Sequence, residues 1–251
     1  MEGPSLYLAA EQLAPFVHRK VRTVKGNTHI GKERLKGQEI LAIFSWGKHL
    51  VFQCKNFALR VHFLLFGSFE AIIEDEVVTG DYAKKRANPR LELSFTNGKI
   101  ILYSCSLQYI ESSQARETYD FTIDTISPDW DSSAAFKNVK EHPDEEISDV
   151  LLDQTLFAGV GNIIRNEVLF LTRTLPWTHV SDLSDASLKK IIKTVRSYVF
   201  QFYEWRKQFV LKKHYQVYRQ RTCPVCHEKV TRKKTGQRAR ISFFCTKCQK
   251  K

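Results

Sequence analysis

Four cysteines near the C-terminus constrain this chain more than any other feature of its sequence. They form two Cys-x2-Cys pairs, Cys223/Cys226 and Cys245/Cys248, separated by eighteen residues. Each pair can place two thiolates on one side of a tetrahedral zinc ion, and two pairs complete its ligand shell. Because a fully ligated ion has no open position, the spacing predicts one structural Zn²⁺. Four unrelated buried cysteines are the alternative.

The segment between the two cysteine pairs is basic and ends in the apolar run ISFF. A β-hairpin closed at its base by zinc would present its cations at the tip, where they could contact phosphates or enter a groove. These cations are Arg232, Lys233, Lys234, Arg238 and Arg240. His227 lies beside a ligand, but four cysteines suffice, so we assign it no metal role.

The positive charge of the chain is concentrated at the same end. The net charge is +12, and residues 206–251 hold fifteen Lys or Arg against a single acid, Glu228. Such a cluster favours a nucleic-acid partner over a membrane or an acidic protein. No apolar run approaches the roughly 18 residues that a membrane span needs, so no membrane partner is expected.

The N-terminal sequence predicts the compartment. MEGPSLYLAA lacks the basic and apolar regions of a secretory signal. We therefore expect a reducing location, either the cytoplasm with nucleoid association in a bacterium or the nucleus in a eukaryote, where thiols bind metal more often than they form disulfides. Cys54 and Cys105 lie in strand-like runs and are expected in the core. Nothing suggests an oligomer, so a monomer is expected.

The first half of the chain has the pattern of a β-rich domain. Residues 5–18 show helical apolar spacing. Seven short β-branched or aromatic runs follow, with a strong hairpin signal at Asn97-Gly98. These runs are residues 21–24, 39–44, 49–53, 58–63, 68–73, 91–95 and 99–104. Seven such strands predict a β-sandwich or barrel.

The second half is expected to be helical. Residues 111–148 are polar, acidic and interrupted by prolines, which indicates loops with short helical pieces. Helices are predicted over 148–157, 163–171 and 186–205, the last after an N-cap at Ser184. The resulting class is an α+β multidomain chain. Its predicted parts are a β-sandwich domain with an α-helix (1–110), a connecting segment (111–147), a helical domain (148–210) and a zinc-finger β-hairpin (211–251).

Four separated segments point together to one family. They are the start Met1-Glu2-Gly3-Pro4, the sequence Trp46-Gly47-Lys48-His49, residues 151–169 (LLDQTLFAGVGNIIRNEVL) and the end RARISFFCTKCQKK. The chain thereby resembles the formamidopyrimidine-DNA glycosylase/endonuclease VIII family of base-excision enzymes. The resemblance spans the whole chain and is weakest over residues 110–145. It implies an N-terminal catalytic β-sandwich, a helix–two-turn–helix DNA-binding domain and a four-cysteine zinc finger.

The resemblance implies a DNA glycosylase/AP lyase that flips a damaged base and attacks the sugar C1′ with its N-terminal amine. Strand cleavage follows by elimination through a Schiff base. A terminal amine has a pKa of about 7.7–8.0 against about 10.4 for Lys, so its neutral fraction at neutral pH is on the order of a hundredfold larger. Met1 would supply this amine, Glu2 would move protons, and Lys48 would contact phosphate and assist catalysis. A solvated strand end is the alternative for Lys48.

Several contacts to damaged DNA follow from the same resemblance. Asn162, after a glycine turn, would bind a backbone phosphate at a helix N-terminus; an ordinary helix turn is the alternative. Arg240, five residues before Cys245, has the spacing of the family's phosphate-clamping arginine. Arg238 is the alternative if the hairpin register differs. Arg165 is also expected to contact DNA.

Base flipping leaves a hole in the base stack that a protein side chain fills. The segment HFLLFGSF, residues 62–69, matches the family's intercalation loop. Leu65 and Phe66 are its expected wedge residues, with core residues of a strand as the alternative.

The chain departs from the family pattern at its start. Most members carry Pro after the initiator Met, whereas Glu2 follows Met1 here. Methionine is generally not trimmed before a large acidic residue, so we expect Met1 to be retained and to act through a primary amine. Ser5 stands where the family commonly has another Glu. A catalytically impaired damaged-DNA-binding protein of the same fold is therefore the main alternative, and an RNA- or ribosome-associated zinc protein is a third.

Substrate class is indicated by the segment before the cysteines. Residues 203–222 contain no glycine and leave little room for the loop that oxidised-purine enzymes of the family place over the flipped base. Gly3 and the Arg165/Glu167 pair also resemble the endonuclease VIII branch. We expect oxidised pyrimidines or ring-opened bases as substrates, with weak activity on 8-oxoguanine.

Overall fold

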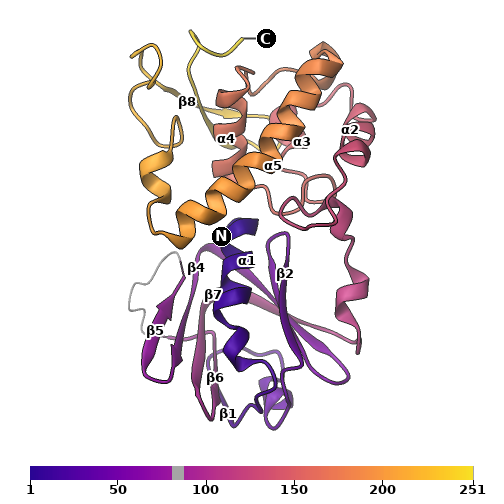
Figure 1. Cartoon of the computed structure of the whole chain (residues 1–251), viewed down its shortest axis with the longest axis vertical. Coiled ribbons are helices and arrows are strands. Elements are labelled where there is room, and N and C mark those ends of the chain that lie inside the picture. The colour runs from indigo at the N-terminus through magenta and orange to yellow at the C-terminus, as the bar shows by residue number, and fades with distance from the viewer. Residues whose placement is uncertain (81–87, 251) are drawn as a thin grey trace. The chain divides into compact units, whose positions relative to one another are not determined.

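The computed structural model describes residues 1–80 and 88–250, which form two compact units, Met1–Asp120 and Phe121–Lys251 (Figure 1). The helical region and the zinc finger, expected to be separate domains, lie in the same unit. The finer domain boundaries at residues 110, 147 and 210 stay predictions.

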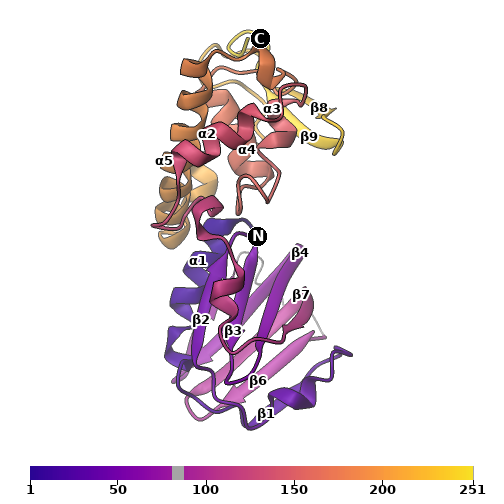
Figure 2. The same cartoon turned by 90° about the vertical axis from the view of Figure 1, so that its right-hand side faces the viewer.

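The first unit consists of a helix and a seven-stranded antiparallel sheet. Its elements are α1 (Gly3–Gln12), β1 (Thr23–Lys25), β2 (Ala42–Trp46), β3 (His49–Gln53), β4 (Ala58–Ile73), β5 (Glu76–Thr79), β6 (Leu91–Phe95) and β7 (Gly98–Ile110). The strand order is β1-β6-β7-β4-β3-β2, with β5 paired to β4. α1 packs against β2 and β3 (Figure 2).

Two long strands join the layers of the predicted sandwich. β4 contains both runs expected at 58–63 and 68–73, and it pairs with β7 along both. The register shifts between Phe63 and Ser68, where the chain bulges. Side chains from both ends of β4 and β7 enclose one core, as a sandwich requires. The seven runs thus give six of the seven strands, and β5 was missed because it is short and largely exposed.

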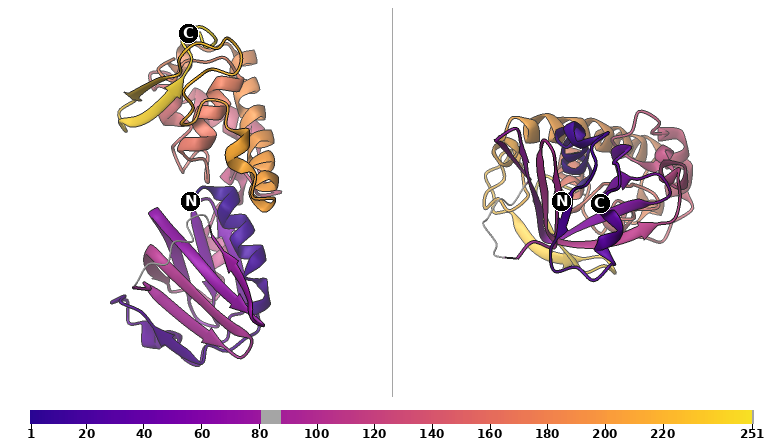
Figure 3. Two further views of the ribbon diagram at one scale, coloured as in Figure 1. Left: turned by 90° about the vertical axis from the view of Figure 1, so that its left-hand side faces the viewer. Right: turned by 90° about the horizontal axis from the view of Figure 1, so that it is seen from below.

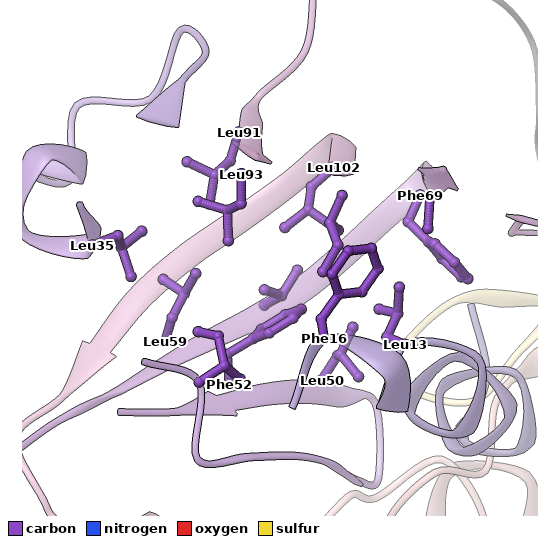
Figure 4. Packing of buried hydrophobic residues seen from close by; sticks show 14 of the residues in the cluster. Leu13, Phe16, Leu35, Leu50, Phe52, Leu59, Phe69, Leu91, Leu93 and Leu102 are labelled. Atoms are coloured by element: carbon purple, nitrogen blue, oxygen red, sulfur yellow. The ribbon is translucent and has the colours of Figure 1, made fainter. Parts of the chain in front are cut away.

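The core of this unit is built from strand residues and from the chain after α1. Leu13 and Phe16 are fully buried and point among strand side chains such as Phe52 and Leu102 (Figure 4). Cys54 and Cys105 are buried in the same core, as predicted. Burial raises the pKa of Cys54 to about 11 and that of Cys105 to about 12, so neither thiol ionises at neutral pH.

The hairpin signal at Asn97-Gly98 is confirmed. Phe95 pairs with Gly98 across a two-residue turn that joins β6 to β7. Gly98 has φ +142°, and a Cβ there would collide with the carbonyl oxygen of Ile72. Only glycine fits this position.

The second unit is helical and carries a β-hairpin (Figure 3). Its elements are α2 (Ser132–Lys140), α3 (Ile147–Val150), α4 (Asn162–Leu171), α5 (Asp185–Lys207), β8 (Thr231–Thr235) and β9 (Arg240–Phe244). Among the described residues of both units, short 3₁₀ turns occur at Ala14–Phe16, Lys32–Leu35, Ala115–Thr118, Phe121–Ile123, Val180–Asp182 and Leu211–His214. None of the helices in the described ranges is both long and apolar enough to cross a bilayer.

The helix predictions differ in outcome. α4 and α5 form where expected, and the Ser184 hydroxyl accepts a hydrogen bond from the Ser187 N–H as the predicted N-cap. The helix predicted over 148–157 is wrong, because α3 ends at Val150. The Asp153 carboxylate accepts hydrogen bonds from the backbone and hydroxyl of Thr155, which replaces helical pairing with a local turn.

Candidate functional site

The four C-terminal cysteines come together as the spacing predicts. Their sulfur atoms lie within 4.8 Å of one another, with separations of 3.8 Å for Cys223–Cys248 and 3.4 Å for Cys226–Cys245. Zn–S bonds of about 2.3 Å in a tetrahedron require sulfur separations of about 3.8 Å. The cluster can therefore hold a metal ion, and His227 lies outside it.

Little apolar surface supports this metal site. The buried cluster around the cysteines contains Phe170, Val217, Val230 and Phe243. A core of this size stabilises a module weakly, so an ion held by the four cysteines is expected to add to the stability of the hairpin base.

The start of α4 is joined to the hairpin that the cysteines close. The Asn162 side-chain N–H donates to the carbonyl oxygen of Ile241 at 3.0 Å. Ile241 directly follows Arg240, the first residue of β9. The structure thus brings together two residues predicted independently as phosphate ligands, Asn162 and Arg240.

Arg165 is not at the surface, so its expected contact with DNA is wrong. Its side chain is fully buried and donates to the carbonyl oxygen of Ile241 at 3.0 Å and to the Ser242 hydroxyl at 2.8 Å. α4 is buried over most of its length, which leaves this position no access to solvent. Arg165 instead fixes β9 against α4.

Glu167, on the same helix, is also fully buried. Its carboxylate accepts hydrogen bonds from three consecutive backbone N–H groups, those of Gln216, Val217 and Tyr218, at 2.7–3.0 Å. Burial raises the pKa of Glu167 although these three donors oppose the shift. This carboxylate anchors the segment that leads into the first cysteine pair.

The tip of the hairpin is held by two carboxylates. Asp149 accepts from the Gln237 backbone N–H at 2.6 Å, and Asp153 pairs with the Arg238 guanidinium at 2.6 Å. Burial would raise the pKa of Asp153, but hydrogen bonds from Thr155 and the charge of Arg238 hold it below its usual range. Arg238 is therefore engaged within the protein.

Arg240 differs from Arg238 in this respect. It is exposed, and within the described part of the chain its guanidinium has no ion-pair partner. Between the two arginines considered from the spacing, the geometry favours Arg240 as the one that can bind an external anion.

Replacing Gly236 by Ala is expected to destabilise this tip by about 2 kcal/mol or more. Gly236 has φ +71°, and a Cβ there would collide with the Asp149 carboxylate. Thermal unfolding measures the loss. The matched control is Gly37→Ala, with φ +79° and open space around it, which should cost only about 1 kcal/mol. Equal losses in the two variants would show that the Asp149 contact has no importance.

In the first unit, the N-terminal residues are held by the start of α1. Glu2 precedes the helix in an extended conformation, and Gly3 and Pro4 form its first turn, where Pro is favoured. Glu2 is only 8% exposed. The Met1 side chain packs against the core, near Phe69 and Gly80. The terminal amine is therefore held in a fixed place.

Lys48 lies in a two-residue turn that joins β2 to β3. Trp46 and His49 pair across it, and Gly47 supplies the positive φ (+51°) that such a turn needs at its first position. The His62 ring nitrogen Nδ1 lies 3.1 Å from the Lys48 carbonyl oxygen, so Nδ1 donates and carries the proton.

The pKa of His62 is affected by two of the predicted catalytic residues, Met1 and Lys48. Burial lowers its pKa most, and the positive charges of the N-terminal amine and of Lys48 lower it further, against the hydrogen bond to Lys48. The Lys48 backbone therefore contacts the His62 ring, and the N-terminal amine is near enough for its charge to lower the pKa of the same ring. The assigned chemical roles of Met1, Glu2 and Lys48 stay predictions.

Sequence reasoning missed an aromatic cluster beside Lys48. The His49 ring stacks on Trp46 with 5.7 Å between centroids, and it meets His62 edge-on at 5.5 Å. Leu50 pairs with Val61, so His49 and His62 are cross-strand neighbours. The sequence did contain a signal for this cluster. His49 begins the predicted strand 49–53 and His62 lies near the end of the next predicted strand, 58–63, so an antiparallel pairing of the two strands brings the histidines together.

This cluster predicts a pH dependence of stability. Burial and the charges of Arg60 and His62 lower the pKa of His49 to about 4. In the unfolded chain His49 takes up a proton below about pH 6.5, whereas in the folded chain it stays neutral down to about pH 4. The contribution of His49 to folding stability is therefore fully present above about pH 6.5 and is lost as the pH falls toward 4. The loss is roughly 2 kcal/mol after allowance for the ring's partial exposure.

Thermal unfolding between pH 7.5 and pH 4.5 measures this effect. His49→Gln is expected to flatten the pH profile, while His29→Gln, at an exposed histidine of the same unit, should leave it unchanged. A His49→Gln profile as steep as that of the unmodified protein would contradict the assignment.

The predicted wedge residues are exposed. Leu65 and Phe66 have exposed fractions of 68% and 54%, at the point where the register of β4 shifts, and the preceding Leu64 is 51% exposed. They are therefore not core residues, which was the alternative. Their insertion into DNA stays a prediction.

The fold and site define a class of protein: a β-sandwich with a fixed N-terminal amine, followed by a helical unit whose hairpin is closed by four cysteines. Residues 122–204 match the family described as Formamidopyrimidine-DNA glycosylase H2TH domain. Endonuclease 8-like 3 of Homo sapiens is 34% identical over 207 residues, which covers 81% of this chain and 33% of that protein. The chain belongs to the formamidopyrimidine-DNA glycosylase/endonuclease VIII family.

Other relatives match over nearly their full length. Formamidopyrimidine-DNA glycosylase of Nitrosococcus oceani is 22% identical over 238 residues, covering 86% of this chain and 84% of that protein. The solved structure of the Lactococcus lactis formamidopyrimidine-DNA glycosylase, bound non-covalently to DNA with an AP site, superposes with a TM-score of 0.85 over 100% of both chains at 22% identity. This likeness confirms the predicted fold. The chain spans about a third of the length of the endonuclease 8-like 3 relatives.

Proposed function

We propose that this protein is a bifunctional DNA glycosylase/AP lyase of base-excision repair that removes oxidised bases, pyrimidines in particular. The observation that carries the proposal is the geometry at the N-terminus. The Met1 side chain packs against the core of the first unit, Glu2 next to it is only 8% exposed, and the Lys48 carbonyl oxygen lies 3.1 Å from the His62 ring. A terminal amine fixed beside a carboxylate and a lysine suits nucleophilic attack on a sugar carbon. A protein that only bound damaged DNA would not need the amine held in place.

The reaction uses the chain's own groups at each step. The neutral Met1 amine attacks C1′ as the bond to the damaged base breaks and the base leaves with a proton. Transfer of a proton to O4′ opens the sugar and leaves an iminium between C1′ and the Met1 nitrogen. Loss of a C2′ proton then expels the 3′ phosphate by elimination. Glu2 accepts and donates these protons, and Lys48 binds the phosphate beside the lesion.

Each unit contributes its own contacts to DNA. In the second unit, Asn162 and Arg240 bind backbone phosphates. In the first unit, Leu65 and Phe66 fill the space that the flipped base vacates. The proposal that this protein binds DNA is supported by the structurally similar Lactococcus lactis enzyme, which was solved in complex with DNA. The four cysteines hold one structural Zn²⁺, consistent with their sulfur separations. The protein acts as a monomer, on the nucleoid of a bacterium or in a nucleus.

Arg240→Ala is expected to weaken binding to DNA of any sequence and to reduce the slope of log affinity against log salt by about 1. The reason is that Arg240 contacts phosphate rather than base edges. Titrations at several salt concentrations measure the slope. Arg238→Ala is the matched control, since Arg238 is paired with Asp153, and it should change the slope less. A larger change for Arg238 would reverse the assignment.

Borohydride trapping tests the proposal. The protein is mixed with duplexes that carry thymine glycol, 8-oxoguanine, an AP site or no damage, and the imine is reduced to a covalent complex. We expect trapping on the AP-site and thymine glycol duplexes, weak trapping on 8-oxoguanine, and none after acetylation of the N-terminal amine. Tight binding to damaged DNA without trapping would favour the impaired, binding-only alternative. Faster release of 8-oxoguanine than of thymine glycol would overturn the pyrimidine preference.

A further inference from the structure

The second residue after the end of α5 is an exposed aromatic with a disfavoured backbone. Phe209 is 75% exposed, more than the wedge residue Leu65 at 68%. Its backbone has φ +60°. Left-handed conformations of this kind are rarely adopted by bulky residues.

The helix end explains why this conformation is required. The Phe209 N–H donates to the carbonyl oxygen of Arg206, and the Val210 N–H donates to that of Trp205 at 2.9 Å. This is the pattern that closes helices with a left-handed residue, a position at which glycine is usual. Phenylalanine here is doubly unfavourable for folding, since the backbone is strained and the ring faces water. Such a residue points to a role in binding.

The exposed ring is held on an ordered support. Trp205 precedes Phe209 in the chain, and its ring stacks on the His214 ring with 4.1 Å between centroids and an interplanar angle of 2°. Leu211, two residues after Phe209, is buried. The chain around Phe209 is thus anchored to α5 at both ends, and the ring stands out from a fixed base.

The surroundings of the ring are strongly basic. Arg206 lies 5.8 Å from the ring centroid, and Lys207, Lys212 and Lys213 are exposed within four residues of Phe209. No acidic residue occurs between Glu204 and Glu228. An apolar protein partner would need a wider apolar surface than one ring among cations. A flat π-face with flanking positive charge is instead complementary to a nucleobase and its phosphates.

We propose that Phe209 is a stacking platform for an unpaired, undamaged nucleobase of DNA, with Lys207, Lys212 and Lys213 contacting the adjacent phosphates. The site lies at the C-terminal end of α5, outside the residues assigned to phosphate clamping, intercalation and catalysis. It rests on the proposed function in that DNA is the ligand. It adds a contact that depends on an unpaired base rather than on damage.

Binding of a fluorescein-labelled single-stranded oligo-dT, followed by anisotropy, tests this site. Phe209→Ala and Phe209→Gly are expected to weaken binding about tenfold, and Phe209→Trp to retain it. Phe200→Ala is the matched control, since Phe200 lies on α5, is 43% exposed and has Arg196 over its ring at 4.4 Å, and this variant should bind like the unmodified protein. An oligonucleotide of abasic residues should bind the Phe209 variants and the unmodified protein equally.

Stability separates this role from a role in folding. Because glycine is favoured at this helix end, Phe209→Gly should unfold at the same or a higher temperature while it binds oligo-dT more weakly. Unchanged oligo-dT binding by Phe209→Ala would overturn the proposal. So would a loss of affinity confined to oligonucleotides with a damaged base, since that would make Phe209 part of lesion recognition.

Borohydride trapping on an AP-site duplex, carried out in parallel, distinguishes this inference from the proposed function. If the unmodified protein traps DNA and Phe209 variants bind oligo-dT normally, only the stacking site is wrong. If nothing is trapped while oligo-dT binding still depends on Phe209, the stacking site stands and the lyase assignment fails.

Discussion

Glu2→Gln is expected to reduce base excision and borohydride trapping by about 10²–10⁴-fold, the usual contribution of a positioned acid–base group. The substitution preserves the shape of the side chain and removes its ability to exchange protons. Glu2 is 8% exposed and its side chain makes no capping hydrogen bond to α1, so Gln, which has the same shape, leaves the start of the helix capped as before. Folding and affinity for DNA should therefore stay close to those of the unmodified protein.

Single-turnover excision from a thymine glycol duplex gives the rate, and a binding titration gives the affinity. Glu11→Gln, an exposed position on the same helix, serves as the matched control and should retain full activity. A Glu2→Gln variant that excises the base within about threefold of the normal rate would remove Glu2 from the proposed mechanism. The proton carrier would then have to be sought elsewhere.

Features that depend on short-range spacing were predictable from the sequence. The two Cys-x2-Cys pairs fix their own geometry, because each pair can reach only one side of an ion. α5 follows from its apolar period and from Ser184, whose hydroxyl caps the first turn. The hairpin at Asn97-Gly98 follows from a position that only glycine can occupy.

Features that depend on packing were not predictable. The sequence presents Arg165 as a cation near a phosphate-binding turn, but tertiary packing buries it completely against β9. The helix expected at 148–157 was lost to a side-chain competition, because Asp153 binds the Thr155 N–H. The union of two predicted strands into β4 depends on pairing with β7 across a bulge, which is a long-range property.

The candidate site falls between these two cases. Asn162 and Arg240 were each assigned from local motifs, and their proximity became evident only from the hydrogen bond between Asn162 and the Ile241 carbonyl. Likewise, the closeness of the N-terminal amine and Lys48 emerges through His62, a residue with no predicted role. The motifs identified which residues carry the chemistry, and the fold shows which of these residues lie close together.

Metal removal is expected to reduce DNA affinity by at least about 100-fold and to unfold the β8–β9 hairpin. The buried cluster around the cysteines has few apolar residues, whereas structural Zn²⁺ contributes on the order of 10 kcal/mol to the folding of small modules. β9 ends directly before Cys245 and begins at Arg240, so loss of the ion frees the arginine that we propose to bind phosphate. Arg165 and Asn162 would at the same time lose their acceptor on Ile241.

A chelator titration with a colorimetric zinc indicator measures the release of about one ion per chain, and DNA binding is followed in the same samples. Cys245→Ser should reproduce the loss of affinity without chelator. Cys54→Ala, at a buried cysteine of the first unit, should keep the ion and the affinity. DNA binding that survives complete removal of the ion would mean that packing against α4 alone orders the hairpin. In that case the contacts of Asn162 and Arg165 to Ile241, rather than the cysteines, would position Arg240.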